Sequence, residues 1–436
     1  MKPIQSDPTP VPHVPAPEPS GADGSRQPAA RFRFPGWRRF LLVAGPGVVV
    51  MLADTDAGSV ITAAQSGASW GYRLLALQFL LIPILYVVQE LTVRLGVLTG
   101  KGHGALIQEH YGRGWAWVSV GTLIVACIGA LLSELSGLAG VGQLFGVPVS
   151  WTMGIVFVGL SLMVVRGSYL TVERIAMAIG SFEVVFLVVA WMAHPGLPDM
   201  VRGSMSIPWH SPDYQYLVAA NIGAVLMPWM VFFQQSSVVE KGLRAEDLRA
   251  ARWDTALGAV ATQVIMAAVL VATAAGLGTA AKGAALDNVP QIAQAFTRAL
   301  GPMVGRVLFG LGLTGSALVA TIVVTLTAAR ALAEALGADH RLDRTLRQAP
   351  WFYGVYMLAL GAAAIVVASG VDLVRVSVGV QVMNALLLPV VLGFLYLLAR
   401  RLPSAVRLRG AYEKAVLLII VLTTGLGVYS AIAGMF

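Results

Sequence analysis

The sequence predicts an all-α integral membrane protein whose eleven transmembrane helices form an inverted repeat of five and five, with discontinuous first and sixth helices. Three observations support this prediction: the composition, the number of long apolar segments, and the interruptions in two of them. Of the 436 residues, 57% are hydrophobic and only 12% are charged, about half the charged fraction of a soluble domain. Such a chain cannot cover a globule with polar side chains, so lipid must solvate it. The 47 glycines agree, because small residues let membrane helices approach closely.

Residues 1–37 differ from the rest of the chain. They contain nine prolines and many Ser, Gly and Ala residues without helical or strand periodicity, which predicts a disordered tail. The tail lacks the apolar core that a cleavable signal peptide needs. Basic residues stand around its end, at Arg31, Arg33, Arg38 and Arg39. Because bases beside a first span retain the N-terminus in the cytoplasm, we expect the tail to be cytoplasmic.

Residues 38–436 are predicted to form one transmembrane domain. A crossing needs roughly 20 apolar residues, and eleven segments are long enough: approximately 40–67, 72–98, 115–143, 149–166, 173–193, 214–239, 255–279, 303–336, 351–369, 375–400 and 412–435. We assign the first five, about 40–193, to one repeat and the next five, about 214–400, to the other. The eleventh segment, 412–435, is then an additional helix.

The Lys and Arg residues concentrate in alternate loops, which predicts the topology. With the N-terminus inside, the cytoplasmic connections hold Lys101, Arg113, Arg166, Arg174, Lys241, Arg244, Arg249, Arg252, Arg341, Arg344, Arg347, Arg400, Arg401, Arg407 and Lys414. The opposite loops hold scattered bases such as Arg73, Arg202, Lys282 and Arg298. This positive-inside pattern predicts a multi-pass protein of the cell (inner) membrane with Phe436 outside. It also accounts for the net charge of +8 without a nucleic-acid partner.

Composition and motifs exclude other classes of protein. The single Cys127 permits neither a disulfide framework nor a cysteine metal site. The sequence has no nucleophile–base constellation and no phosphate-binding loop, so an enzyme is not expected. No cofactor is implied, and neither is an obligatory protein partner. The expected partners are the lipid bilayer and a transported solute.

The first apolar segment is interrupted by Ala53-Asp54-Thr55-Asp56-Ala57-Gly58-Ser59. A carboxylate in mid-membrane costs on the order of 2.5–3.5 kcal/mol on insertion scales. Two of them are expected where they face a polar cavity and bind a positive group. Alternatively, Asp54 and Asp56 cap the second half-helix or pair with Arg94, but this leaves the second carboxylate unexplained.

The sixth segment contains Pro228 in the sequence Gly223-Ala224-Val225-Leu226-Met227-Pro228-Trp229-Met230. Proline lacks an N–H and clashes with the preceding turn, so carbonyls near Ala224 lose their helical partners. Freed carbonyls at membrane depth must face protein, water or an ion. Breaks in corresponding helices of two repeats indicate a substrate site at the repeat interface.

The ligand types at the two breaks favour a divalent cation. Asp56 offers an anionic oxygen, Ser59 a hydroxyl, and the unwound backbone offers the carbonyls of Ala53 and Ala224. Hard oxygens suit Mg²⁺ and Mn²⁺. The thioether of Met227 is softer and favours Mn²⁺ or Fe²⁺, although a methionine in a membrane helix usually only fills space.

At these residues the chain resembles the Nramp family of divalent metal transporters. The family's Asp-Pro-Gly-Asn motif of the first broken helix corresponds to Asp56-Ala57-Gly58-Ser59, and its Met-Pro-His-Asn motif corresponds to Met227-Pro228-Trp229-Met230. The second helix matches more closely, through Gln89, Leu91, Arg94-Leu95-Gly96 and Thr99-Gly100-Lys101. The resemblance covers roughly residues 40–435 and implies a leucine-transporter-like fold. It also implies that Asp56, Ala224 and Met227 bind the metal.

Several departures from the family pattern bear on selectivity and coupling. Ser59 replaces the family's Asn, which predicts a larger and wetter pocket, and Asp54 adds a carboxylate where the family usually has an aromatic residue. Trp229 and Gln234 replace the two family histidines that are linked to proton coupling. These departures resemble the divergent Nramp-related magnesium transporters. We therefore expect a secondary transporter of Mg²⁺ and Mn²⁺ without obligatory proton coupling.

Two alternatives remain open at this point. A proton-coupled Mn²⁺/Fe²⁺ symporter fits the retained Met227. A sodium-coupled symporter of organic solutes fits the same architecture, but two aspartates at one spot repel an anionic substrate.

Other polar residues in the spans are candidates for the site or the pathway. Glu134 is a possible proton relay or vestibule charge, and the amides of Gln381 and Asn384 in the tenth segment can supply neutral oxygens. Glu90 and Arg94 are four residues apart, so we expect them to pair with each other. His103 lies in a cytoplasmic loop and is expected to be solvated.

Overall fold

The structure is a computed structural model that describes the chain outside residues 1–45, 167–177, 179–180, 277–285, 337–349 and 405. Every described element is a helix, which confirms the predicted all-α class. The predicted tail, residues 1–37, lies outside the described residues. The start of the predicted fifth segment, 173–193, also lies outside the described residues. The described part of this segment contains a helix.

The chain order of the helices follows the predicted segments. They are α2 (Pro46–Asp54), α3 (Ala57–Trp70), η1 (Gly71–Leu74), α4 (Leu75–Thr99), α5 (His103–Tyr111), α6 (Arg113–Leu144), α7 (Val149–Arg166), η2 (Ser181–Glu183), α9 (Val184–Met192), α10 (Leu197–Ser204), α11 (Pro212–Val225), α12 (Pro228–Glu240), η3 (Ala245–Asp247), α13 (Leu248–Gly276), α14 (Val289–Leu300), α15 (Pro302–Leu336), α16 (Pro350–Ala368), α17 (Leu373–Arg401) and α18 (Gly410–Met435). Each of the eleven predicted segments overlaps at least one of these helices. The short helices α5, α10 and α14 lie in predicted loops.

Length and composition identify seven helical stretches in the described chain as candidates to cross a membrane. The number becomes eight if η2–α9 and α10, which meet at a bend of 104°, form one broken span. The apolar helices α7 and α16 are shorter. The protein is therefore a helical membrane protein, and the count of eleven crossings stays a prediction.

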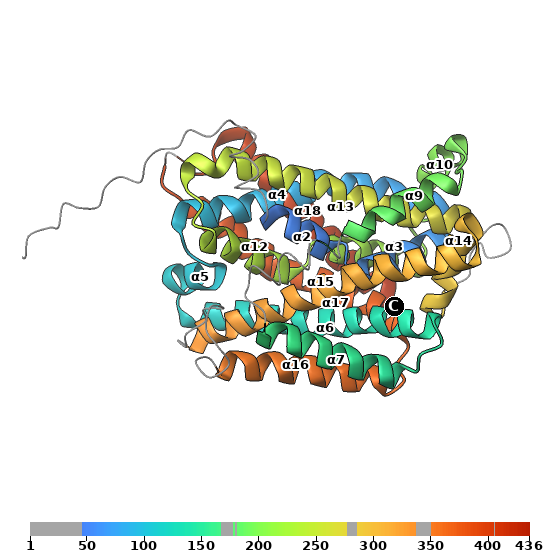
Figure 1. Ribbon diagram of the computed structural model, residues 1–436. Helices are drawn as coiled ribbons and strands as arrows, with labels where there is room; N and C mark the ends of the chain where they lie inside the picture. Colours follow the sequence, from blue (N-terminus) through green and yellow to red (C-terminus); the bar gives the residue numbers. More distant parts are fainter. Residues whose placement is uncertain (1–45, 167–177, 179–180, 277–285, 337–349, 405) are drawn as a thin grey trace, which may run out of the picture.

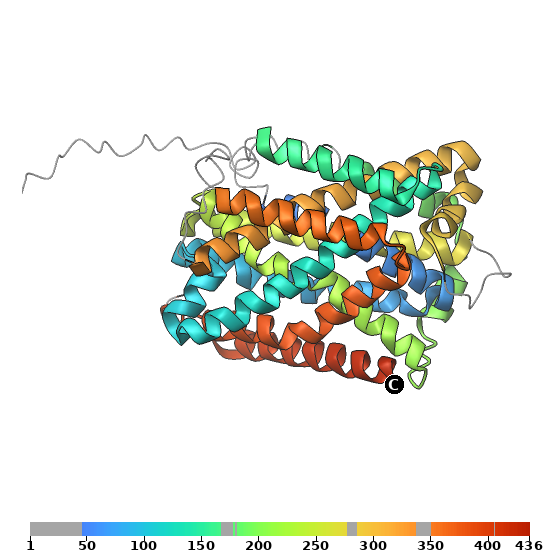
Figure 2. The same ribbon diagram turned by 90° about the horizontal axis from the view of Figure 1, so that it is seen from below.

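The helices run roughly parallel in an elongated bundle (Figures 1 and 2). Figure 2 shows α18 along one side of the bundle and α7 along the opposite side. The broken helix α11–α12 is the most enclosed: 94% of its most apolar window is buried, against 33% for α18. The sixth predicted segment thus lies at the centre, and the eleventh lies at the periphery.

Both predicted helix breaks are present, and each is only two residues long. The first separates α2 from α3 at Thr55 and Asp56, and the second separates α11 from α12 at Leu226 and Met227. The sequence predicted a longer interruption, through Ser59. The difference arises because Asp56 has an extended backbone (φ −64°, ψ 170°) and caps α3, so that the helix resumes at the next residue.

Pro228 explains the second break in the same local way. It occupies the first position of α12, where its missing N–H costs nothing. Met227 before it has an extended backbone (φ −77°, ψ 135°), because the α conformation is disfavoured before proline. The carbonyl of Ala224, four residues before Pro228, consequently has no helical N–H from which to accept a hydrogen bond.

Candidate functional site

The two helix breaks meet at a direct hydrogen bond. The hydroxyl of Ser59, in the first turn of α3, donates to the carbonyl oxygen of Ala224 in α11 at 3.0 Å. Both residues are buried. The carbonyl that Pro228 deprives of a helical partner is therefore satisfied by the other broken helix. This contact brings two of the predicted site residues together, although they are 165 positions apart in the sequence.

Asp56 lies beside this contact and is fully buried. Its Oδ1 accepts a hydrogen bond of 2.6 Å from the backbone N–H of Ser59. Its Oδ2 has no hydrogen-bond partner among the described residues. Helix capping thus explains one oxygen of Asp56, and the carboxylate is also in direct contact with a second acidic group, Glu134 of α6.

Asp54 makes different contacts, although it is only two residues away. Its Oδ2 accepts from Nε2 of Gln89 in α4 at 3.0 Å, and the same nitrogen lies 3.3 Å from the sulfur of Met230 in α12. Its Oδ1 has no partner in the described chain. Gln89 and Met230 were not among the predicted site residues. The polar Gln89 in an apolar helix was the available signal.

Two glutamates complete a group of four buried carboxylates. Glu134 in α6 accepts from the backbone N–H of Ala57 at 3.0 Å and interacts directly with the carboxylate of Asp56. Glu183 accepts a hydrogen bond from the hydroxyl of Thr55. Each has a second oxygen without a partner among the described side chains and backbone.

No lysine or arginine of the described chain forms an ion pair with these four carboxylates. Arg94, the partner considered from the sequence, is engaged elsewhere. The described residues contain no group of three or more His, Cys, Asp or Glu side chains placed to hold a metal ion. A cation bound here must therefore take hydroxyl, carbonyl, amide or thioether ligands in addition to carboxylates.

Gln381 and Asn384 come from α17, which approaches both broken helices. Nδ2 of Asn384 donates to Oε1 of Gln381 at 2.9 Å, while Nε2 of Gln381 has no partner within the described structure. A methyl group added at Gly58 would lie 2.1 Å from that Nε2. The amide of Gln381 therefore lies directly against Gly58 at the start of α3. In the sequence, Gly58 stands between Asp56 and Ser59.

The remaining predicted residues are buried around the two breaks. Met227 occupies the N-cap position of α12, and Ala53 is the second-last residue of α2, where its carbonyl lacks a helical partner. Trp229 and Gln234 are fully buried in α12, and their side-chain nitrogens have no partners in the described part of the chain. Neither side chain titrates near neutral pH.

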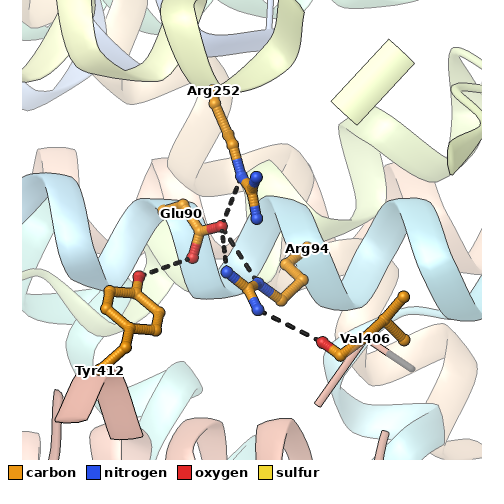
Figure 3. Close-up of polar contacts among 5 residues, drawn as sticks. All are labelled: Glu90, Arg94, Arg252, Val406 and Tyr412. Carbon is orange, nitrogen blue, oxygen red and sulfur yellow. Dashed lines mark hydrogen bonds and ion pairs between the residues drawn. The ribbon is translucent and has the colours of Figure 1, made fainter. Parts of the chain in front are cut away.

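The predicted pair of Glu90 and Arg94 is present and belongs to a larger network (Figure 3). Oε1 of Glu90 accepts from Arg94 at 2.8 Å and from Arg252 of α13 at 2.7 Å. Its Oε2 accepts from the hydroxyl of Tyr412 in α18 at 3.3 Å. Arg94 also donates to the carbonyl of Val406 at 3.3 Å. The network ties α4, α13 and α18 together and does not touch the four carboxylates.

The expectation that His103 is solvated is wrong. Its ring is buried, with Nδ1 3.1 Å from Oε1 of Gln235 and an edge-to-face contact with Phe232 at 4.8 Å between centroids. Burial lowers the pKa of His103 to about 4, so the ring is neutral at physiological pH. The predicted loop folds as α5 and packs against α12, which removes His103 from water.

A cavity of about 1290 Å³ opens at the far end of α3. Its lining includes Gln65, nine residues after Asp56 and hence about 14 Å along the helix. The charged residues that line it are mixed in sign: Arg73, Asp199, Arg202, Asp213, Asp287 and Arg375. No residue of the two helix breaks lines the cavity, so it lies beyond the end of α3 and its lining does not include Asp56.

Comparisons with curated proteins point to one family. A family model described as natural resistance-associated macrophage protein-like (Nramp) matches residues 47–433. The divalent metal cation transporter MntH of Klebsiella pneumoniae is 27% identical over 296 residues, which cover 66% of this chain and 70% of that protein. MntH of Bradyrhizobium diazoefficiens is 28% identical over 309 residues, covering 66% and 67%.

Solved structures share the fold. The manganese transporter of Eremococcus coleocola superposes with a TM-score of 0.72 at 20% identity, over 92% of this chain and 88% of that one. MhsT in complex with L-phenylalanine superposes with a TM-score of 0.56 at 14% identity, over 90% and 98%. Because the family model spans most of the sequence, and the fold agrees with it, this chain is a multi-pass membrane protein of the natural resistance-associated macrophage protein-like (Nramp) family.

Proposed function

We propose that this chain carries divalent metal ions, Mn²⁺ and Mg²⁺, across the membrane through a site centred on Asp56. The observation that carries the proposal is the group of four buried carboxylates without a basic partner in the described chain. Buried carboxylates are stable only when protons or a cation compensate them. A site of this charge attracts cations and repels the carboxylate of an organic solute.

The ligand set combines both broken helices. Oδ2 of Asp56, the hydroxyl of Ser59 and the carbonyl of Ala224 are oxygen donors at the breaks. Gln381 presents its amide nitrogen to Gly58 and its amide oxygen to Asn384, so a half-turn of this amide would bring its oxygen to the ion. Ala53 and Met227 add a carbonyl and a thioether. When an ion enters, the Ala224 carbonyl can exchange the Ser59 hydroxyl for the metal, so the hydrogen bond between the breaks marks the position of the ion.

The choice of ions follows from relatives and from residues of this chain. The relatives named MntH and the Eremococcus coleocola protein are described as divalent metal and manganese transporters. Ser59 is short, and Asp54 adds charge. Mg²⁺ prefers to keep part of its water shell and is held by one or two carboxylates. These two residues therefore favour Mg²⁺ as a second ion, as in the Nramp-related magnesium transporters.

Transport is proposed to run down the electrochemical gradient of the metal, without obligatory proton movement. Trp229 and Gln234 cannot carry protons near neutral pH, and His103 is buried and neutral. Asp54 and Glu134 are the candidate proton carriers, and a divalent cation beside a carboxylate favours its ionised form. The proposed topology keeps the N-terminus in the cytoplasm and Phe436 outside, with repeats at about 40–193 and 214–400.

The test is uptake of radioactive Mn²⁺ into proteoliposomes, with Mg²⁺ and Ca²⁺ as competitors and a pH-sensitive dye inside. We expect Mn²⁺ uptake that Mg²⁺ inhibits, no metal-dependent acidification, and loss of uptake in Asp56→Asn. Asp372→Asn is the matched control. Asp372 likewise caps a helix, by accepting a hydrogen bond from the backbone N–H of Arg375, but it lies at the surface.

Wild-type uptake in Asp56→Asn would overturn the metal site. Acidification that depends on Mn²⁺ and on Asp56 would establish the proton-coupled alternative.

A further inference from the structure

The polar group around Asp54 is not explained by the ligand set around Asp56. Asp54 ends α2, and its carboxylate is held by Gln89 of α4, whose amide also contacts the sulfur of Met230 in α12. Three helices therefore converge on a small volume on the side of the break where α2 lies. No residue of the proposed Asp56 ligand set takes part in these contacts.

Two acceptors in this volume are unsatisfied. Oδ1 of Asp54 and Oε1 of Gln89 have no hydrogen-bond partner among the residues that the structure describes, and both side chains are at least 99% buried. Buried polar atoms are nearly always paired, so unpaired acceptors on two side chains in contact indicate a missing positive group. A buried carboxylate without a counter-charge is more costly than a neutral unpaired acceptor, so it indicates a missing cation more strongly.

From these contacts we infer that Asp54, Gln89 and Met230 form a second position for the transported cation, an inference that rests on the proposed function. The donors are a carboxylate, an amide oxygen and a thioether. In the present arrangement the amide nitrogen of Gln89 faces Asp54 and Met230. A half-turn of the terminal amide exchanges its nitrogen and oxygen, and then presents a ligand instead of a donor.

The donor set determines which ions this position takes. The Met230 thioether favours softer divalent cations, so Mn²⁺ and Cd²⁺ are held there more tightly than Mg²⁺. The Asp56 position offers mainly oxygens, with one thioether from Met227. The thioether of Met230 therefore makes the second position prefer Mn²⁺ to Mg²⁺, although the Asp54 carboxylate can still hold a partly hydrated Mg²⁺.

The location of the second position gives the order of occupancy. The cavity lies at the far end of α3, Asp56 caps the start of α3, and Asp54 ends α2. A cation arriving from the cavity reaches Asp56 before Asp54. The two aspartates are two residues apart, at most about 7 Å along the backbone. Two divalent cations repel strongly at such a distance, so one ion occupies the positions in turn.

Crystals of the full chain soaked in Cd²⁺ test this inference by anomalous scattering. Because one ion occupies the positions in turn, we expect partial density at both positions in the wild type. Asp56→Asn should leave density only beside Asp54 and Met230, and Asp54→Asn only beside Asp56. In proteoliposomes, Asp54→Asn should lower Mn²⁺ flux about tenfold and leave the Mn²⁺ affinity of the Asp56 position within about threefold.

Met230→Leu keeps the volume of the side chain and tests the same position if Asp54→Asn does not fold. It should remove Cd²⁺ density at the second position and leave Mg²⁺ flux unchanged. Met266→Leu, at a buried methionine of α13, is the control.

The outcomes separate the two proposals. Density confined to Asp56 in the wild type, with wild-type flux in Asp54→Asn and Met230→Leu, would overturn the second position and leave the proposed function intact. Absence of density at both positions, together with absence of Mn²⁺ flux, would overturn both.

Discussion

At the scale of single residues, Asp56 combines two roles that usually fall to different side chains. One carboxylate oxygen caps α3 through the N–H of Ser59, an interaction worth about 1 kcal/mol. The other oxygen is left without a donor in the described chain. The cap fixes the carboxylate at the break, so that the second oxygen is already oriented for the proposed cation. A preorganised ligand of this kind loses little conformational entropy on binding.

Met227 makes the first residue-scale prediction. Its position at the N-cap of α12, fully buried at the second break, points to a thioether ligand of the Asp56 site. Met227→Leu keeps the apolar volume and removes the sulfur. We expect Cd²⁺ and Mn²⁺ affinities to fall about tenfold while Mg²⁺ affinity stays within about twofold. Isothermal titration calorimetry on the purified protein measures all three. Equal losses for the three ions would mean that Met227 only shapes the pocket.

At the scale of helices, the site depends on the close approach of α17 to both broken helices. A methyl group at Gly223 of α11 would lie 1.8 Å from the carbonyl oxygen of Gln381, and one at Gly58 would lie 2.1 Å from its amide nitrogen. The first of these neighbours is backbone, which cannot rotate away. The absence of a side chain at Gly223 therefore lets α17 place Gln381 against the break.

We predict that Gly223→Ala separates α11 from α17 and lowers both metal affinity and thermal stability. Gly354→Ala in α16 is the matched control, because a methyl group there meets nothing within 4 Å, and alanine favours a helix by about 1 kcal/mol over glycine. A fluorescence-based thermal unfolding assay with and without Mn²⁺ measures both effects. A Gly223→Ala protein with wild-type stability and a wild-type Mn²⁺ shift would show that α17 tolerates the methyl group.

The helix-scale features differ in how far the sequence could predict them. Pro228 and Asp56 act on their own turns of helix, so the breaks could be predicted from local chemistry. The contacts of Asp54 with Gln89 and of Thr55 with Glu183 join residues 35 and 128 positions apart. No local pattern specifies such pairs. His103 was mispredicted for the same reason, because its burial depends on α12.

At the scale of the whole molecule, the two ends of the bundle differ. The end of α3 opens into the cavity lined by Gln65. The end where α2 begins is held together by the network around Glu90, which is buried and contacts α13 and α18. There, Oδ2 of Asp254 in α13 also accepts from the N–H of Gly47 at 2.8 Å. The described arrangement thus has a cavity at one end of α3 and a network of polar contacts at the end where α2 begins.

This asymmetry leads to a prediction about the end where α2 begins. A small apolar cluster of Val93, Val97, Val238 and Ala251 packs beside the network and joins α4, α12 and α13. If the network holds this end closed, Glu90→Gln removes the charge that two arginines share, and the end opens more often. The reporter is Val97→Cys, whose side chain is only 7% exposed in the wild type. The native Cys127 is buried and does not interfere.

We expect a maleimide to label Val97→Cys about fivefold faster in the Glu90→Gln background, because breaking a buried ion pair costs far more than breaking an exposed one. Glu109→Gln is the control, since Glu109 pairs with Lys101 at 2.6 Å and both side chains are about half exposed. Removing that surface pair should leave the labelling rate unchanged. Equal labelling rates in all three backgrounds would show that helix packing alone closes this end. If labelling is faster in Glu90→Gln, and excess Mn²⁺ changes that labelling rate further, the closed end is linked to occupancy of the metal site.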